Sequence, residues 1–168
     1  MNIFEFALKM ELDGEEYYRS LSEKTAHEDL KRILESLADD ELRHYEIIQL
    51  AQKQMTEAIE SNPSLSRENN VFNSMDSIKD SLNKQEVIAK LKDEQIDVYR
   101  EALKKEKDSV ALYQRLTKAA EKPEEMRICQ RLMQEEEQHV EVIENIIEML
   151  NRVSDWVEAA EFNHSDNY

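Results

Sequence analysis

The two halves of this chain align with each other without a gap at an offset of 95 residues. Residues 7–48 match residues 102–143 at 14 of 42 positions. The aligned pairs include His44 with His139 and, three residues before each histidine, a glutamate. Self-similarity of this kind indicates that one structural unit occurs twice. We therefore expect two similar halves, related by an internal pseudo-twofold axis.

Each half is predicted to be a hairpin of two long helices. The chain has only one Gly and two Pro among 168 residues, and its apolar residues recur at helical spacing. The expected helices lie at about 2–25, 28–60, 93–120 and 123–153. These segments predict an all-α, single-domain chain, 1–168, folded as a four-helix bundle of two hairpins.

Two further segments complete the predicted organisation. Residues 61–92 are predicted to be a long crossover between the hairpins, with a short helix near 85–91, because Ser and Asn are frequent in them. Residues 153–168 are predicted to be a short C-terminal tail. A bundle with one long crossover fits the internal repeat, since the crossover separates the two equivalent hairpins.

Charge and cysteine content exclude several classes of function. With 38 acidic and 22 basic side chains the formal net charge is -16, so we expect neither nucleic acid nor an anionic membrane as a partner. An acidic start and the lack of a long apolar run predict a cytoplasmic protein. The single cysteine, Cys129, allows no internal disulfide and no four-cysteine metal site. It is expected to be a small core residue.

Ionisable residues interrupt the apolar stripe of every predicted long helix. Buried carboxylates cost several kcal/mol each, by order of magnitude, unless they are protonated, paired or bound to metal. We find no Lys or Arg on these stripes to pair with them. The candidate metal ligands are Glu11, Glu41, His44, Glu106, Glu136 and His139.

The spacing of these residues predicts a centre of two metal ions. A Glu-x-x-His pair places both side chains on one helix face, where they can hold one ion together. Two such pairs, with one further glutamate from each remaining helix, supply four carboxylates and two imidazoles. Two divalent cations would balance the four negative charges. These residue types alone leave iron, zinc and manganese open.

Two tyrosines are candidates for a supporting catalytic role. Tyr18 and Tyr113 follow Glu11 and Glu106 by seven residues, which is two turns along the same stripe. They are expected to donate hydrogen bonds to ligand carboxylates, to carry electrons, or simply to pack in the core. His27 is expected to be exposed.

The motifs together resemble those of the rubrerythrin-like branch of the ferritin-like superfamily. The resemblance spans nearly the whole chain. It implies a ferritin-like bundle, a cofactor of two iron ions, oxidase or peroxidase chemistry, and a homodimer. The motifs are Ala7-Leu8-x-x-Glu11-x-x-Gly14-x-x-Tyr17-Tyr18, Glu41-x-x-His44, Ala102-Leu103-x-x-Glu106-Lys107-Asp108-Ser109 and Glu136-x-x-His139.

The chain also departs from typical members of that branch. They carry a rubredoxin-like iron–cysteine module, which this sequence lacks, so we expect an external electron donor. They also have a glutamate where this chain has Ser109. That glutamate belongs to their redox-dependent ligand switch. The remaining symmetric ligand set is similar to that of bacterioferritin.

Three functions remain open from the sequence. The first is an oxidoreductase active in oxidative stress, which reduces hydrogen peroxide or O2 at a di-iron centre with electrons from the external donor. The second is a protein that sequesters iron and has ferroxidase activity. The third is a bundle that holds zinc or manganese without redox turnover.

Overall fold

The computed structural model describes residues 3–54, 56–66 and 89–165. It is an all-α, ferritin-like bundle, as the sequence predicts, and no strand occurs in these three ranges. The four long helices are α1 (Ile3–Lys24), α2 (Glu28–Gln52), α7 (Ile96–Ala119) and α8 (Pro123–Ser165). Two short helices, α3 (Thr56–Ser61) and α4 (Pro63–Ser66), follow α2.

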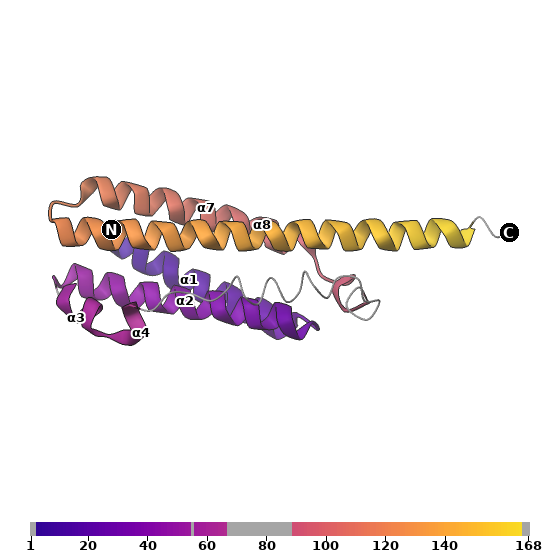
Figure 1. Cartoon of the computed structure of the whole chain (residues 1–168), viewed down its shortest axis with the longest axis horizontal. Coiled ribbons are helices and arrows are strands. Elements are labelled where there is room, and N and C mark those ends of the chain that lie inside the picture. The colour runs from indigo at the N-terminus through magenta and orange to yellow at the C-terminus, as the bar shows by residue number, and fades with distance from the viewer. Residues whose placement is uncertain (1–2, 55, 67–88, 166–168) are drawn as a thin grey trace.

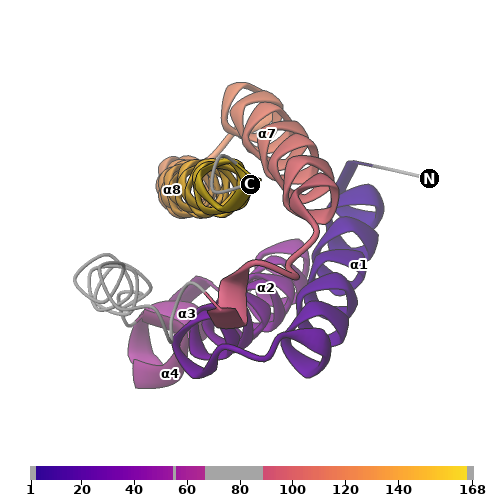
Figure 2. The same cartoon turned by 90° about the vertical axis from the view of Figure 1, so that its right-hand side faces the viewer.

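The long helices form two antiparallel hairpins. Residues 25–27 connect α1 to α2, and residues 120–122 connect α7 to α8. Seen along the bundle, α1 and α2 form one pair and α7 and α8 the other, with α1 beside α7 (Figure 2). The predicted crossover connects these pairs. Its residues 67–88 lie outside the described part, and only 89–91 of the predicted helix at 85–91 are described, as helix.

Two predicted helix boundaries are wrong. The helix expected at 28–60 ends at Gln52, because Gln54 adopts a left-handed backbone conformation with a φ of 60°. The expected tail at 153–168 is instead helical as far as Ser165, so that α8 extends beyond the rest of the bundle (Figure 1). Residues 153–165 contain neither Gly nor Pro, and nothing in this segment therefore breaks the helix.

The beginnings of α2 and α8 have clear local causes. His27 is the N-cap of α2, and its Nδ1 accepts a hydrogen bond from the backbone N–H of Leu30 at 3.3 Å. His27 is buried, so the expectation that it is exposed is wrong. Pro123 is the first residue of α8, where a proline has no hydrogen bond to lose, and two acidic residues follow it in the first turn.

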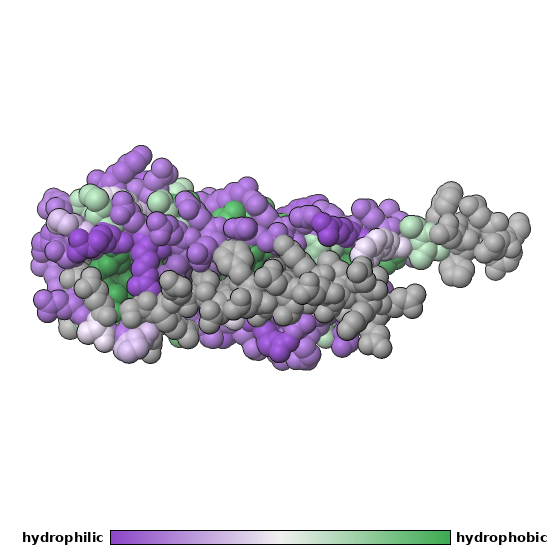
Figure 3. Space-filling view, viewed as in Figure 1, coloured by the Kyte–Doolittle hydropathy of each residue, from purple (hydrophilic) through white to green (hydrophobic). Residues whose placement is uncertain are grey.

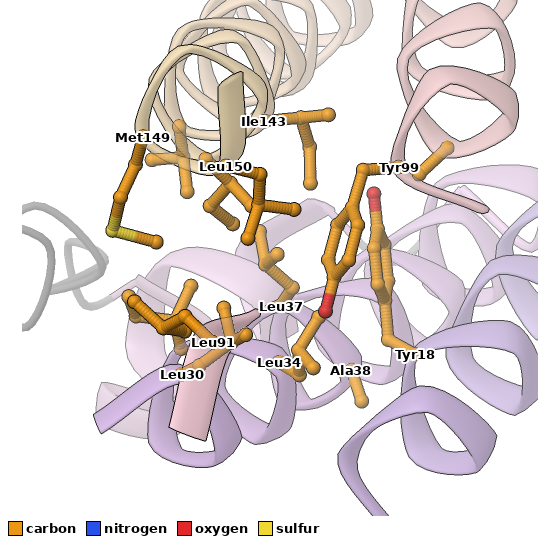
Figure 4. Close-up of a cluster of buried hydrophobic side chains, with 14 of the residues drawn as sticks. Tyr18, Leu30, Leu34, Leu37, Ala38, Leu91, Tyr99, Ile143, Met149 and Leu150 are labelled. Carbon is orange, nitrogen blue, oxygen red and sulfur yellow. The ribbon is translucent and has the colours of Figure 1, made fainter. Parts of the chain in front are cut away.

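The core consists of two apolar clusters with a polar layer between them. One cluster joins the end of α1 and the start of α2 to α7 and α8, and it includes Tyr18, Leu34, Tyr99 and Ile143 (Figure 4). The other cluster lies towards the opposite ends of these helices and includes Ala7, Ile47, Leu112 and Leu132. On each long helix a predicted glutamate ligand lies between residues of the two clusters. The bundle therefore encloses the candidate ligands in its middle.

The surface agrees with the acidic composition. On the face shown in Figure 3, hydrophilic residues predominate among those that the structure describes. No helix among the described residues is long and apolar enough to cross a membrane.

Candidate metal centre

The six predicted ligands converge in the polar layer of the bundle. All six side chains are buried, with at most 3% of each residue exposed. Their potential ligand atoms form two groups, and the atoms within each group lie within 4.8 Å of one another. The first group is Glu11, Glu41, His44 and Glu136, and the second is Glu41, Glu106, Glu136 and His139. The two groups overlap, as expected of two adjacent ion positions.

The four glutamates differ in whether they belong to one ligand group or to both. Glu41 from α2 and Glu136 from α8 belong to both groups, whereas Glu11 from α1 and Glu106 from α7 each belong to one. Glu41 and Glu136 are thus placed to bridge two ions. This arrangement follows the internal repeat, because the 95-residue offset exchanges the two groups.

The two histidines face the cluster with the same ring nitrogen. Nδ1 of His44 lies 2.9 Å from Glu136 Oε1 and 3.6 Å from Glu11 Oε2. Nδ1 of His139 lies 3.0 Å from Glu41 Oε1 and 3.4 Å from Glu106 Oε1. The two rings are stacked, with their centroids 5.8 Å apart. Each Nδ1 is therefore the atom available to one ion of the pair.

Several atoms of this cluster have no hydrogen-bond partner among the described residues. They include one carboxylate oxygen of each glutamate, namely Glu11 Oε2, Glu41 Oε1, Glu106 Oε2 and Glu136 Oε2, and also His139 Nδ1. Buried polar atoms are rarely left unsatisfied in proteins, and a bound ion is one common explanation. Carboxylate oxygens and imidazole nitrogens suit divalent transition metals. The residues present therefore fit a pair of metal ions.

Without metal, several groups of this cluster bind protons more readily than they would in water. Burial and the charges of Glu106 and Glu11 raise the pKa of Glu136 to about 8. Burial, together with the charges of Glu11 and Glu136, also raises the pKa of Glu41 well above its usual value. Burial likewise opposes ionisation of Glu106, but the charge of His139 together with hydrogen bonds to Glu136, His139 and Tyr18 outweighs it and lowers the Glu106 pKa to about 2.

The histidines respond to the same carboxylates in the opposite direction. Burial alone would lower the pKa of His44, but the charge of Glu11 and hydrogen bonds to nearby carboxylates raise it well above its usual value. Glu106 and Asp40 have the same effect on His139. Metal ions must therefore compete with protons for Glu41, Glu136 and the two histidines.

Tyr18 and Tyr113 each hydrogen-bond to one candidate ligand. The Tyr18 hydroxyl donates to Glu106 Oε1, and the Tyr113 hydroxyl donates to Glu11 Oε1. In both cases the second carboxylate oxygen is an unpartnered atom of the cluster. Burial and neighbouring charges raise the pKa of both hydroxyls well above the usual value, so both remain donors. The tyrosines thus orient the glutamates that belong to a single group.

Sequence reasoning missed a second layer of carboxylates behind the histidines. Asp40 Oδ2 lies 3.0 Å from Nε2 of His139, and Glu135 Oε2 lies 3.3 Å from Nε2 of His44. Each contact joins a residue of one hairpin to a histidine of the other. Such contacts to the distal nitrogen fix the orientation of a metal-binding imidazole.

Arg43 connects these two carboxylates. It is 3% exposed and contacts both Asp40, at 3.2 Å, and Glu135. Its Nη1 also donates to the carbonyl oxygen of Leu65, at 3.3 Å, in the short helix α4. These contacts do not contradict the expectation that no Lys or Arg pairs with the candidate ligands. Arg43 neutralises the carboxylates behind the histidines, not the candidate ligands themselves.

The internal repeat of the sequence indicates this second layer of carboxylates. Asp40 and Glu135 are aligned at the offset of 95 residues, and each directly precedes a candidate bridging glutamate. Two acids at matching positions beside two ligands indicate a shared role. Arg43, in contrast, aligns with Gln138, and periodicity alone does not indicate that a cation is buried there.

Gly14 allows α1 to pass close to a candidate bridging ligand. A Cβ atom added at this position would lie 3.2 Å from Glu41 Oε2 and 3.4 Å from Glu41 Cδ. The contact with Oε2 is tighter than ordinary van der Waals packing. The absence of a side chain therefore leaves room for the carboxylate of Glu41.

A cavity of about 250 Å³ leads from the surface between α1 and α7 to this centre. At its buried end it is lined by Tyr18, Glu41 and Glu106, and at its exposed end by residues such as Lys9 and Asp108. A small molecule can therefore reach one bridging glutamate and one glutamate of the second group from solvent.

Cys129 takes no part in this centre. It is buried in the second apolar cluster. Burial and the charge of Glu125 raise the pKa of its thiol to about 11, so the thiolate is scarce near neutral pH. The structure thus agrees with its expected role as a small core residue.

A four-helix bundle with a symmetric carboxylate–histidine cluster at its centre defines the class of ferritin-like proteins. The family model of rubrerythrin matches residues 2–147, and the chain belongs to this family. The match includes all six candidate ligands and ends within α8. Comparisons with curated proteins and with solved structures found no match.

Proposed function

We propose that this chain is a di-iron oxidoreductase that reduces hydrogen peroxide or O2 with electrons from an external donor. The observation that supports it most is the buried pair of overlapping ligand groups, reached from solvent by a cavity. The rubrerythrin family match favours iron as the metal. In this proposal Glu11 and His44 would hold one ion, Glu106 and His139 would hold the other, and Glu41 and Glu136 would be shared by both.

The charge of the site supports a ferrous pair in the resting reduced state. Four ionised glutamates balance two divalent ions, so the reduced centre can remain buried without excess charge. Two ferrous ions together supply two electrons, which is the number needed to reduce hydrogen peroxide to water or O2 to peroxide. The surrounding chain holds the ligands in position through Tyr18 and Tyr113.

The position of Ser109 bears on the choice of oxidant. Its hydroxyl donates to the backbone carbonyl of Lys105 at 3.0 Å and lies 3.4 Å from the sulfur of Met10. The nearby acid Glu15 lies 3.6 Å from Arg19 on the same helix. Neither supplies a further carboxylate to the second ion position. We therefore expect both histidines to stay ligated in both oxidation states, with a weaker preference for peroxide over O2 than in typical rubrerythrins.

Stopped-flow mixing of the diferrous protein with each oxidant tests this proposal. We expect oxidation by both, followed by return of the ferrous state when a chemical or protein donor is added. Inertness towards both oxidants would rule out the oxidoreductase function. A strong preference for peroxide would contradict the argument from Ser109 but not the function itself.

The same protein samples distinguish the alternatives. Uptake of iron well beyond two ions per chain, without re-reduction by a donor, would favour an iron-sequestering role. Tight retention of zinc or manganese in preference to iron, without redox turnover, would favour a non-redox bundle.

A further inference from the structure

The cavity beside the candidate centre is larger than the proposed oxidants require. Hydrogen peroxide and O2 each have two non-hydrogen atoms, whereas the cavity measures about 250 Å³. For comparison, a water molecule occupies about 30 Å³ in the liquid, and a protein cavity of about 150 Å³ can bind benzene. The space therefore suffices for a phenyl group and several further atoms.

The walls of the cavity are mainly apolar. Phe6, Met10 and Tyr17 line it on α1, and Ser109 lines it on α7. Tyr17 is fixed there, because its hydroxyl donates to the carbonyl oxygen of Val98 at 2.6 Å. Aromatic rings and a thioether pack well against an organic group.

Two of the residues that line the cavity are small. Gly14 lies on α1, and Ser109 is its aligned partner on α7. A glutamate at position 109 would place a longer, charged side chain in the cavity. Ser109 therefore leaves room on the α7 side of the cavity for a larger ligand.

The charges near the cavity mouth favour an uncharged ligand. Two cations, Lys9 and Lys105, and two anions, Asp13 and Asp108, line the cavity, so their formal charges cancel. At the inner end are the carboxylates of Glu41 and Glu106. A negatively charged ligand would be repelled there until metal ions are bound.

We propose that this cavity binds the organic group of an uncharged organic hydroperoxide, with its O–O bond towards the Glu41 and Glu106 end. This inference rests on the proposed redox function and names a substrate class for it. The balanced reaction is ROOH + 2 e⁻ + 2 H⁺ → ROH + H₂O. The O–O bond breaks, two ferrous ions supply the electrons and become ferric, and solvent at the open mouth supplies the protons.

The test uses cumene hydroperoxide and hydrogen peroxide in parallel on the diferrous protein. We expect rapid oxidation by both, with a rate that saturates as the concentration of cumene hydroperoxide rises. Ser109→Leu should lower the rate with cumene hydroperoxide relative to hydrogen peroxide by at least about tenfold, because the added side chain takes the place of the organic group. Met10→Trp fills the cavity from α1 and should act in the same direction.

A binding measurement that needs no turnover accompanies the kinetics. Calorimetric titration of the zinc-loaded protein with 2-phenyl-2-propanol, the alcohol formed from cumene hydroperoxide, should show saturable binding that weakens at least about tenfold in Ser109→Leu and Met10→Trp. Lys104→Leu is the matched control, since this exposed residue of α7 does not line the cavity. Metal content and thermal unfolding establish that each variant is folded.

The outcomes separate this inference from the function on which it rests. Oxidation by hydrogen peroxide but not by cumene hydroperoxide would overturn the inference and leave the proposed function intact. An unchanged rate ratio in both cavity-filling variants would also overturn it. Inertness towards both peroxides and O2 would overturn the proposed function, and this inference with it.

Discussion

Gly14 is the only glycine in the chain, and its position in the middle of α1 costs helix stability. Glycine is about 1 kcal/mol less favourable than alanine inside a helix. The space that it leaves beside Glu41 gives a physical reason for this cost. At the scale of single residues, local stability and the geometry of the centre are therefore opposed.

Gly14→Ala should separate these two effects. The metal-free variant is expected to gain up to about 1 kcal/mol in unfolding free energy, while its affinity for zinc falls because the new methyl group displaces the carboxylate of Glu41. Chemical denaturation and zinc titration measure the two quantities. Ser109→Ala, at the aligned position, adds no atom and should change zinc affinity little. Unchanged zinc affinity in Gly14→Ala would contradict the role assigned to this glycine.

Arg43 is the second residue whose effect can be isolated. Arg43→Gln, which introduces the residue type found at the aligned position 138, leaves Asp40 and Glu135 without their shared cation. We expect a loss of about 3–5 kcal/mol in unfolding free energy and a loss of about 10–100-fold in zinc affinity, because the histidines lose their orientation. Chemical denaturation and zinc titration measure both changes.

A control on the same helix makes this prediction specific. Arg32 is largely exposed and pairs with Asp29 one turn earlier, so Arg32→Gln should change either quantity by less than about 1 kcal/mol. Glu135→Gln added to Arg43→Gln should recover part of the lost stability, since it removes one unpaired charge. Equal effects of Arg43→Gln and Arg32→Gln would exclude the proposed role of Arg43.

At the scale of helices, each of the four long elements contributes one candidate glutamate, and α2 and α8 each add a histidine. This division follows from the helical period, because positions three and four residues apart share a face. The same period turns Glu46 and Glu141, two positions after each histidine, towards solvent. Helical phase, rather than the number of acids, therefore selects the ligands.

Substitutions on α2 and α8 test this selection. Glu41→Ala and Glu136→Ala should each lower metal binding strongly, since each removes a candidate bridging ligand. Glu46→Ala and Glu141→Ala remove the same charge from exposed positions on the same helices and should leave binding nearly unchanged. Equilibrium dialysis with zinc measures all four. Equal losses would mean that bulk acidity binds the metal.

The helical period and the repeat also explain how much could be predicted. They predict the two hairpins, and they predict that Glu11, Glu41 and the other four candidate ligands lie close together. They do not predict the break after Gln52, which depends on the left-handed backbone at Gln54. They also miss Arg43, because its contacts with Glu135 and Leu65 join elements far apart in the sequence. They also do not predict that α8 continues to Ser165, although neither Gly nor Pro interrupts residues 153–165.

For the whole molecule, the buried cluster links stability, pH and metal. The pKa of Glu136 is raised to about 8 from a usual value of 4.5, and the pKa values of Glu41, His44 and His139 are raised as well. Between pH 4.5 and about 8, the folded, metal-free protein therefore binds more protons than the unfolded chain. Its stability must fall as the pH rises through this range.

This linkage predicts opposite effects of pH with and without metal. The unfolding temperature of the metal-free protein should decrease between pH 6 and pH 9, whereas zinc affinity should increase by about tenfold per pH unit for every proton released. Differential scanning calorimetry and zinc titration at several pH values measure the two trends. Glu136→Gln should reduce the dependence of the unfolding temperature on pH, while Glu141→Gln, at an exposed position, should not. A metal-free protein that becomes more stable between pH 6 and pH 9 would contradict the linkage.

The central claim is that one chain binds two metal ions in overlapping sites, and its most direct test is the metal content of the reconstituted protein. Anaerobic loading with ferrous iron, removal of unbound metal and elemental analysis should give two iron ions per chain. Subsequent oxidation should produce the optical spectrum of an oxo-bridged diferric centre. Less than one ion per chain in fully loaded, folded protein would contradict the assignment of the centre.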